Sequence, residues 1–153
     1  MPNYGAFVTL TALLTLLTGC GGYKVMVPTV ALKKVTVVAQ KEANKEMVTT
    51  VHFVFPKTET LAEEIRKMDA VAYFAAFADI KASHPNDIEI VSIEAVPGIS
   101  TSQKIQLEDF NSQAAIVYAR YDDSIPGAHR EELKKRCSKV IISLGRTSFG
   151  VAY

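Results

Sequence analysis

The 153-residue chain has little of several features that point to common functions. It contains two cysteines and no tryptophan, and its eight glycines do not form a phosphate-binding loop. Seventeen Lys and Arg against sixteen Asp and Glu leave a formal charge of +1, so no broad electrostatic field attracts nucleic acid. No apolar run reaches the roughly 18 residues that a membrane-spanning helix needs. Nucleotide binding, nucleic-acid binding and a membrane span therefore have no support in the sequence.

The N-terminus carries the clearest positive signal. Residues 1–19 contain no charged side chain, and residues 6–17 form an apolar segment with the length of a signal-peptide core. The alternative is an apolar strand or helix that belongs to the fold. A large aliphatic residue, two small residues and a cysteine then follow one another as in a bacterial lipobox: Leu17, Thr18, Gly19 and Cys20. This resemblance implies cleavage before Cys20 and the attachment of diacylglycerol and an N-acyl chain to it, with no other cofactor.

The predicted signal also sets the compartment and the domain boundaries. Two glycines follow the cysteine where lipoproteins retained in the inner membrane have Asp, which favours the periplasmic face of the outer membrane. We expect residues 20–28 to be a lipidated tether and residues 29–153 to be one periplasmic domain. With Cys20 lipidated, Cys137 is the only remaining thiol and no intramolecular disulfide forms. We expect Cys137 to pack as a small hydrophobe on a helix, a reactive thiol being the alternative.

Period-2 patterns predict that most of this domain is β-structure. The expected strands cover residues 30–39, 47–55, 88–96, 102–108, 113–121, 140–144 and 148–153. The first two are expected to pair antiparallel across the polar turn 40–46. The strand 113–121 is apolar on both faces, so we expect it to be central. About seven short strands with one principal helix indicate a β-sandwich.

Two segments show helical patterns. Residues 61–80 carry apolar side chains at helical spacing behind a capping box at Thr60 and Glu63. Asp69 is a candidate cap for a second turn, a change in chain direction being the alternative. Residues 129–137 contain acidic and basic side chains four positions apart, which favours a second, short helix.

The sequence shows no catalytic constellation and no metal-ligand pattern. The three histidines stand far apart, and His52 is expected to point to solvent from a strand, with a ligand role as the alternative. Asp122 and Asp123 follow the strand 113–121, which favours a solvated turn over a cation site. We therefore expect no catalytic residue and no metal ligand, and a binding or scaffold module rather than an enzyme.

The order of features in the expected domain resembles the outer-membrane lipoprotein family of type VI secretion systems, called TssJ. Three segments carry the resemblance: an aromatic helical segment at 69–79 (DAVAYFAAFAD), an acidic strand end with a Pro-Gly turn at 94–98 (EAVPG), and the strand 115–122 (AIVYARYD). The resemblance covers residues 29–123. It implies a mainly β (α+β) fold, a transthyretin-like antiparallel β-sandwich with an inserted helix.

The same resemblance implies a structural subunit that tethers the periplasmic domain of an inner-membrane TssM-like partner to the outer membrane. It places the partner-binding residues in the turn 40–46: Lys41, Glu42, Asn44, Lys45 and Glu46. Charges of both signs at the end of a sandwich also favour an oriented docking site, although an ordinary solvated turn has the same composition. The alternatives are a lipoprotein of another envelope assembly, such as type IV secretion or a pilus, and a small-ligand-binding or enzyme-inhibitory lipoprotein.

Overall fold

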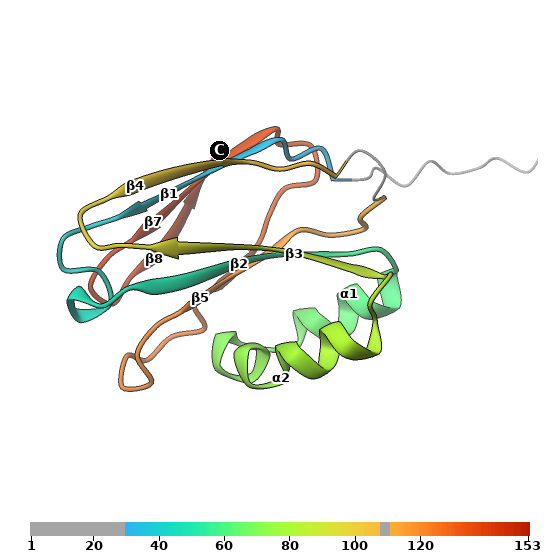
Figure 1. The fold of residues 1–153 in the computed structure, drawn as a ribbon, viewed down its shortest axis with the longest axis horizontal. Helices are drawn as coiled ribbons and strands as arrows, with labels where there is room; N and C mark the ends of the chain where they lie inside the picture. The colour runs from blue at the N-terminus through green and yellow to red at the C-terminus, as the bar shows by residue number, and fades with distance from the viewer. Residues whose placement is uncertain (1–29, 108–110) are drawn as a thin grey trace, which may run out of the picture.

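The computed structural model describes residues 30–107 and 111–153. The predicted signal peptide, the lipobox with Cys20 and the predicted tether lie outside these ranges. The described chain forms two four-stranded sheets packed face to face, and two helices cover the outer face of one of them (Figure 1). Neither helix is long and apolar enough to span a bilayer.

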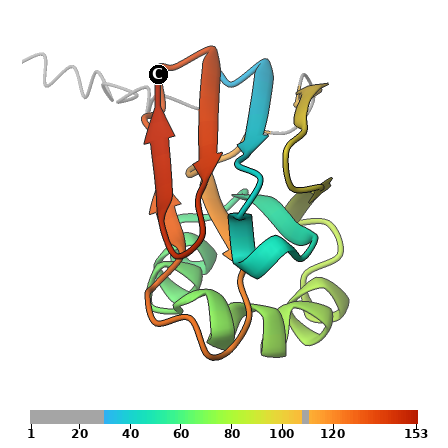
Figure 2. The same ribbon diagram turned by 90° about the vertical axis from the view of Figure 1, so that its left-hand side faces the viewer.

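Sheet A is the sheet whose outer face is not covered by either of the two described helices, and this outer face is called its bare face below (Figures 1 and 2). Its strands lie in the order β4 (Ser100–Lys104), β1 (Lys34–Ala39), β7 (Lys139–Leu144) and β8 (Phe149–Ala152). β1 pairs antiparallel with β4 and parallel with β7, and β7 and β8 form an antiparallel hairpin. Buried and outward side chains alternate along β1 and β7, as their period-2 patterns predicted.

Sheet B is antiparallel throughout and is covered on its outer face by both helices (Figure 1). Its strands lie in the order β3 (Ile88–Ala95), β2 (Thr49–Pro56), β5 (Ile116–Arg120) and β6 (Arg130–Glu132). The helices are α1 (Glu59–Arg66) and α2 (Ala70–Ser83). Because both faces of sheet B are covered, β2 and β5 are almost entirely buried. The predicted central position of the strand 113–121 is confirmed.

Two apolar clusters fill the spaces between the layers. The cluster between the sheets includes Val35, Phe53, Val117 and Ile142, all at most 1% exposed. The cluster between sheet B and the helices includes Val54, Ile65, Tyr73, Ile116 and Tyr118, all fully buried. The domain is a β-sandwich with an inserted helical layer, as the sequence predicted.

The predicted antiparallel pairing of the first two strands is wrong. β1 lies between β4 and β7 in sheet A, whereas β2 lies between β3 and β5 in sheet B. The turn 40–46 therefore crosses from one sheet to the other instead of closing a hairpin. Both strands present an apolar face to the shared core, and this pattern alone does not say whether two consecutive strands share a sheet.

The predicted helix over residues 129–137 is also wrong. Residues 130–132 form β6, which extends sheet B beside β5, and His129 has a left-handed backbone (φ 42°) that no α-helix contains. Glu132 is bonded to Arg66 of α1 at 2.8 and 2.9 Å instead of to a residue four positions away. Pairs four apart in a helix contribute only about 0.2–0.5 kcal/mol, so pairing at the sheet edge outweighs them.

The helical pattern at residues 61–80 forms two helices, and the cap of the first one differs from the expected cap. The side chain of Thr58, not Thr60, accepts the hydrogen bond of the first turn of α1, from the backbone N–H of Leu61 at 3.3 Å. Asp69 caps α2 as predicted and accepts from the N–H of Ala72 at 2.8 Å. The Tyr118 hydroxyl donates to the carbonyl of Ile65 at 2.7 Å, which fixes the end of α1 to sheet B.

Candidate functional site: the loop between the two sheets

The β1–β2 loop, residues 40–46, lies at the end of the sandwich to which β1 runs, at the left of Figure 1. It contains the short turn η1 (Ala43–Glu46). Ala43 and Asn44 are buried, whereas the other predicted partner-binding residues expose their charged side chains: Lys41, Glu42, Lys45 and Glu46. The predicted residues thus lie on one loop, in which Asn44 is buried and the four charged residues are exposed.

The backbone of this loop is left-handed at three consecutive residues. The φ angles are 46° at Asn44, 55° at Lys45 and 66° at Glu46. Asn tolerates this region, but Lys and Glu each lose roughly 1–2 kcal/mol there. No glycine stands in residues 40–46 to signal such a conformation, and the sequence reasoning missed it. A strained turn of this kind persists only where its surroundings hold it.

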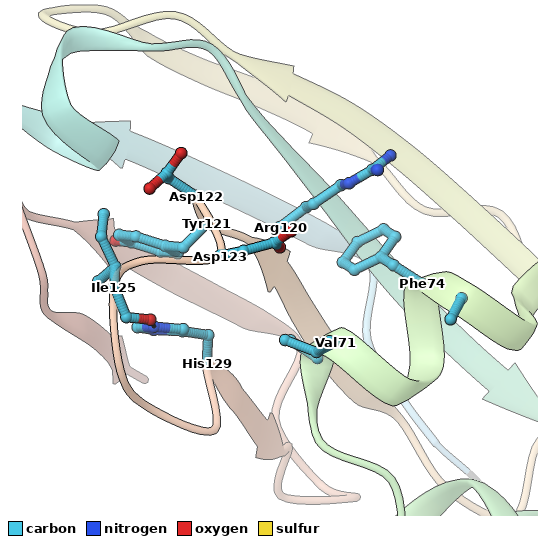
Figure 3. A pocket seen from close by; sticks show the side chains of 10 residues that line it. Val71, Phe74, Arg120, Tyr121, Asp122, Asp123, Ile125 and His129 are labelled. Carbon is cyan, nitrogen blue, oxygen red and sulfur yellow. Dashed lines mark hydrogen bonds between the residues drawn. The ribbon is translucent and has the colours of Figure 1, made fainter.

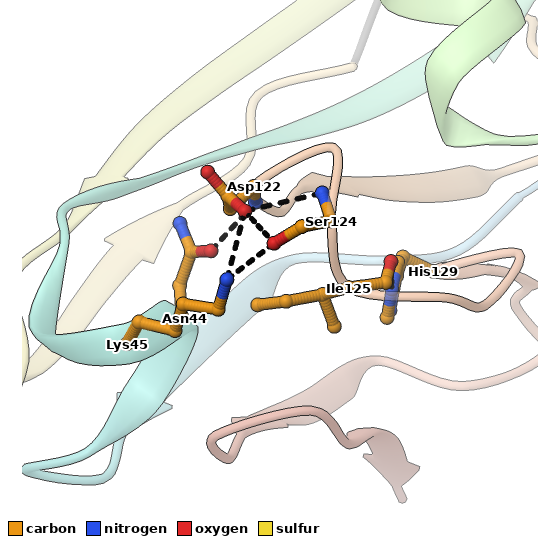
Figure 4. A network of polar contacts seen from close by, with 6 residues as sticks. All are labelled: Asn44, Lys45, Asp122, Ser124, Ile125 and His129. Carbon is orange, nitrogen blue, oxygen red and sulfur yellow. Dashed lines mark hydrogen bonds and ion pairs between the residues drawn. The ribbon is translucent and has the colours of Figure 1, made fainter.

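Asn44 supplies much of that support. Its side chain is 3% exposed, and its Oδ1 accepts a hydrogen bond from the backbone N–H of Asp122 at 2.7 Å (Figure 4). Its own N–H donates to the carbonyl of Gly145 at 3.3 Å. Asp122 follows β5 in sheet B and Gly145 follows β7 in sheet A. Asn44 therefore joins the loop to both sheets, and its removal leaves the partly buried N–H of Asp122 without this acceptor.

Lys45 makes the second connection to the same turn. Its Nζ lies 3.1 Å from Oδ1 of Asp122 and also donates to the hydroxyl of Ser124 (Figure 4). The Ser124 hydroxyl in turn donates to the Asp122 carboxylate. The hydrogen bonds from Ser124, which has the larger effect, and from Lys45 lower the pKa of the Asp122 carboxyl group. The pair is solvent-exposed and adds little stability, but it directs the Lys45 side chain toward the protein. Lys41, Glu42 and Glu46 remain the outward charges of the loop.

Asp122 and Asp123 form a turn, the interpretation favoured from the sequence. The Asp122 carboxylate accepts from the backbone N–H of Ser124 at 3.1 Å, an arrangement typical of Asp in turns. Among residues 30–107 and 111–153, no three His, Cys, Asp or Glu side chains come together in a group that could hold a metal ion.

Exposed apolar side chains border the loop. Met47 and Val48 follow it and are 42% and 52% exposed, and Val96 and Ile99 in the β3–β4 turn are 42% and 52% exposed. The N–H of Gly98 donates to the carbonyl of Ala39 at 2.9 Å, which connects the β3–β4 turn to the end of β1, where the loop begins. This apolar border was missed, because Met47, Val48 and Val96 were assigned to the ends of predicted strands, whereas the observed strands begin at Thr49 and end at Ala95. Exposed apolar groups beside charged ones are typical of protein-binding surfaces.

A hollow of about 180 Å³ lies beside the turn that follows β5, between that turn and the start of α2 (Figure 3). The Arg120 guanidinium lies 5.8 Å from the centre of the Phe74 ring, and the ring of Tyr121 stacks on His129 at 4.2 Å. Pockets for small ligands usually measure about 300–1,000 Å³, so this hollow gives no support to the small-ligand alternative. A larger one, of about 590 Å³ between residues 30–34 and 104–107, borders segments outside the described ranges and gives no argument for a ligand.

The prediction that His52 points to solvent is wrong. His52 is 6% exposed because α2 covers the outer face of β2, and its Nδ1 lies 3.1 Å from the hydroxyl of Tyr73. The rings of Phe74 and Phe77 pack against it at 4.8 and 5.2 Å. Burial lowers the pKa of His52, so the neutral imidazole belongs to the core and lies outside the loop site.

Cys137 packs as a small hydrophobe, as expected, but not on a helix. It is half-buried against the cluster between the sheets, in the turn that precedes β7. Burial raises the pKa of its thiol, and a raised pKa reduces the thiolate that a reactive cysteine needs.

No protein-family model matches the sequence, and no curated protein matches it either. Solved structures do match. The T6SS lipoprotein TssJ1 from Pseudomonas aeruginosa is 16% identical, with a TM-score of 0.61 over 80% of this chain and 95% of that chain. A chain of a type VI membrane complex is 15% identical, with a TM-score of 0.60 over 80% and 99%. A chain of a structure described as the C-terminal domain of the T6SS protein TssM from EAEC is 14% identical, with a TM-score of 0.57 over 80% and 99%.

These likenesses establish the fold. The chain folds as a TssJ-type β-sandwich, and the resemblance to the TssJ family predicted from the sequence is confirmed at that level. The match spans 95–99% of each compared chain, so the shared architecture extends over nearly the whole of each of them.

Proposed function

We propose that the protein is a lipid-anchored periplasmic structural subunit of a type VI secretion membrane complex, which tethers an inner-membrane partner to the outer membrane. The observation that carries this proposal is the shared fold, which includes 95% of the chain of a T6SS lipoprotein. A lipobox-like sequence stands before the domain, at residues 17–20. Both features fit a structural lipoprotein rather than an enzyme.

The proposed anchor is Cys20, with diacylglycerol and an N-acyl chain. Each acyl CH₂ buried in the membrane contributes about 0.8 kcal/mol, and two or more chains hold a protein stably. Residues 21–29 connect the cysteine to the domain, and a fully extended chain spans at most about 3.6 Å per residue. The domain therefore lies within roughly 30 Å of its anchor. We place it on the periplasmic face of the outer membrane.

The proposed docking site is the β1–β2 loop with its apolar border. β1 runs from the tethered end of the domain to this loop, and its six residues span about 20 Å. The loop is thus presented away from the anchor, toward the periplasm. Because Asn44 and Lys45 hold its backbone in one conformation, little conformational entropy is lost when a partner binds. We propose that the partner is the periplasmic domain of a TssM-like inner-membrane subunit.

A charge swap tests the docking site. The double variant K41E/E42K keeps the net charge and changes only outward side chains, so the fold and its thermal midpoint should not change. Co-purification of the inner-membrane partner should fall at least about tenfold, because misplaced like charges at an interface cost several kcal/mol.

The matched control is E63K/K67E, the same swap on the exposed surface of α1 and the residue that follows it. It should leave co-purification unchanged. Equal recovery of the partner with the loop variant and with the control would exclude this loop as the docking site.

A further inference from the structure

Three lysines stand side by side on the bare face of sheet A. Lys34 opens β1, and its register partners are Lys104 on the antiparallel neighbour β4 and Lys139 on the parallel neighbour β7. All three side chains are exposed. Directly paired residues point to the same face of a sheet, with about 4.8 Å between adjacent strands. The three ammonium groups therefore form one row across three strands.

Such a row costs stability, because like charges directly opposite one another in a sheet repel. Further cations surround it. The N–H of Ala31 donates to the carbonyl of Lys135 at 2.9 Å, and the N–H of Ile105 donates to that of Lys33 at 2.9 Å, so both segments meet at the start of β1. Seven of the seventeen basic side chains lie in this part of the chain: Lys33, Lys34, Lys104, Lys134, Lys135, Arg136 and Lys139.

The opposite side of the molecule has the opposite charge. Residues 57–95, which contain both helices and β3, carry four Lys and Arg against eight Asp and Glu. A chain with a formal charge of only +1 is thus divided into a basic bare sheet end and an acidic helical side. In β6, the carboxylate of Glu132 forms an ion pair with Arg66 at 2.8 Å and is not available to the lysine row.

The row lies at the end of the domain where the described chain begins. Val30 is bonded through its N–H to Ser112 at 3.2 Å, four residues before the lysine that opens β1. The segment that precedes it is short enough to keep this end within roughly 30 Å of Cys20. If Cys20 is in the membrane, the basic end is the part of the domain that meets the headgroups.

We propose that the lysine row and the basic residues around it form a docking surface for anionic phospholipid headgroups. The lipid phosphates reduce the repulsion among the three lysines. The domain then contacts the membrane at two places, through the lipid on Cys20 and through this surface. A lipid anchor at one residue limits the distance of the domain from the membrane but not its orientation, and clustered lysines supply the second contact. The β1–β2 loop, at the other end of β1, then points away from the membrane. This inference rests on the proposed function for the anchor and adds the orientation.

The lysines themselves serve as probes. The full mature protein is bound to vesicles of phosphatidylethanolamine and phosphatidylglycerol, or to vesicles of phosphatidylcholine alone, and briefly acetylated, and each lysine is quantified by mass spectrometry. We expect Lys34, Lys104 and Lys139 to react about fivefold more slowly on the anionic vesicles. Lys67 and Lys81 should react equally on both. In 1 M salt, where the screening length is about 3 Å, the protection should disappear.

Two triple variants test whether the lysine row itself is responsible for the protection. K34Q/K104Q/K139Q should remove the protection of Lys134 and Lys135 and should leave the domain at least as stable, because the repulsion is gone. The matched control K67Q/K81Q/R146Q removes the same charge elsewhere and should retain the protection.

Equal labelling of the row on both kinds of vesicle would overturn the inference, as would protection that arises only when a protein partner is added. The mass of the N-terminal peptide separates the two proposals. An unmodified Cys20 contradicts the proposed anchor, whereas protection of the row on anionic vesicles supports the surface with or without the lipid.

Discussion

The two sheets of the sandwich differ in what covers their outer faces. Sheet B lies between the shared core and the helices, so β2 and β5 bury side chains in both directions. Sheet A shares the same core, but no helix in residues 30–107 or 111–153 covers its outer face, and β1 and β7 bury only alternate residues. The covered sheet therefore contributes mainly to stability. The bare sheet keeps a face free for contacts, and the lysine row lies on that face.

One isoleucine on the outer face of each sheet tests this difference, with the largest expected effect on stability. Ile116 on the outer face of sheet B is fully buried under the helices, whereas Ile141 on the outer face of sheet A is 44% exposed. Ile116→Ala should lower the free energy of unfolding by about 2–5 kcal/mol, and Ile141→Ala by no more than about 0.5 kcal/mol. Denaturant titration of both variants measures the difference. Similar losses would mean that the helices do not seal sheet B.

Asn44 tests the connection between the two sheets. Asn44→Ala removes the acceptor of the Asp122 N–H and disfavours the left-handed backbone, so the free energy of unfolding should fall by about 1–3 kcal/mol. Asn44→Gly removes the same acceptor but tolerates the backbone angle, and it should lose less. Denaturant unfolding provides both values. If the two variants lose the same amount, the left-handed conformation contributes nothing measurable.

His52 gives the smallest effect, which depends on pH. Burial holds its pKa below the ordinary 6.5, so between these two values the folded protein binds fewer protons than the unfolded chain. The free energy of unfolding should therefore fall as the pH decreases below 6.5, until the lowered pKa is passed. His52→Gln should flatten this part of the stability–pH curve. An unchanged slope in the variant would show that His52 is not the group responsible.

The same contrast explains which predictions succeeded. Period-2 alternation located β1 and β7, and continuous apolar character located β5, because the number of buried faces decides both patterns. The assignment of strands to sheets failed for β1 and β2, since both show an apolar face to the same core. The sequence of a strand does not show whether a helix covers its outer face, and His52 was therefore predicted to be exposed to solvent. At residues 129–137, acidic and basic side chains four positions apart predicted a helix, but residues 130–132 instead pair with β5 at the edge of sheet B.

The candidate site was predictable in position but not in construction. The polar residues 40–46 between two strands marked a loop with charges of both signs. That Asn44 is buried depends on contacts with Asp122 and Gly145, which are 78 and roughly 100 residues away in sequence. The row of Lys34, Lys104 and Lys139 is likewise created by register between strands that are far apart in the chain.

Mass spectrometry of the protein, extracted from the membranes of its native cell after crosslinking, tests the proposed anchor and docking loop most directly. We expect a chain that begins at a triacylated Cys20, with crosslinks from Lys41 in the β1–β2 loop to the periplasmic domain of an inner-membrane secretion subunit. A chain that retains residues 1–19 without lipid, or one whose crosslinks to that subunit avoid the loop, would contradict this expectation.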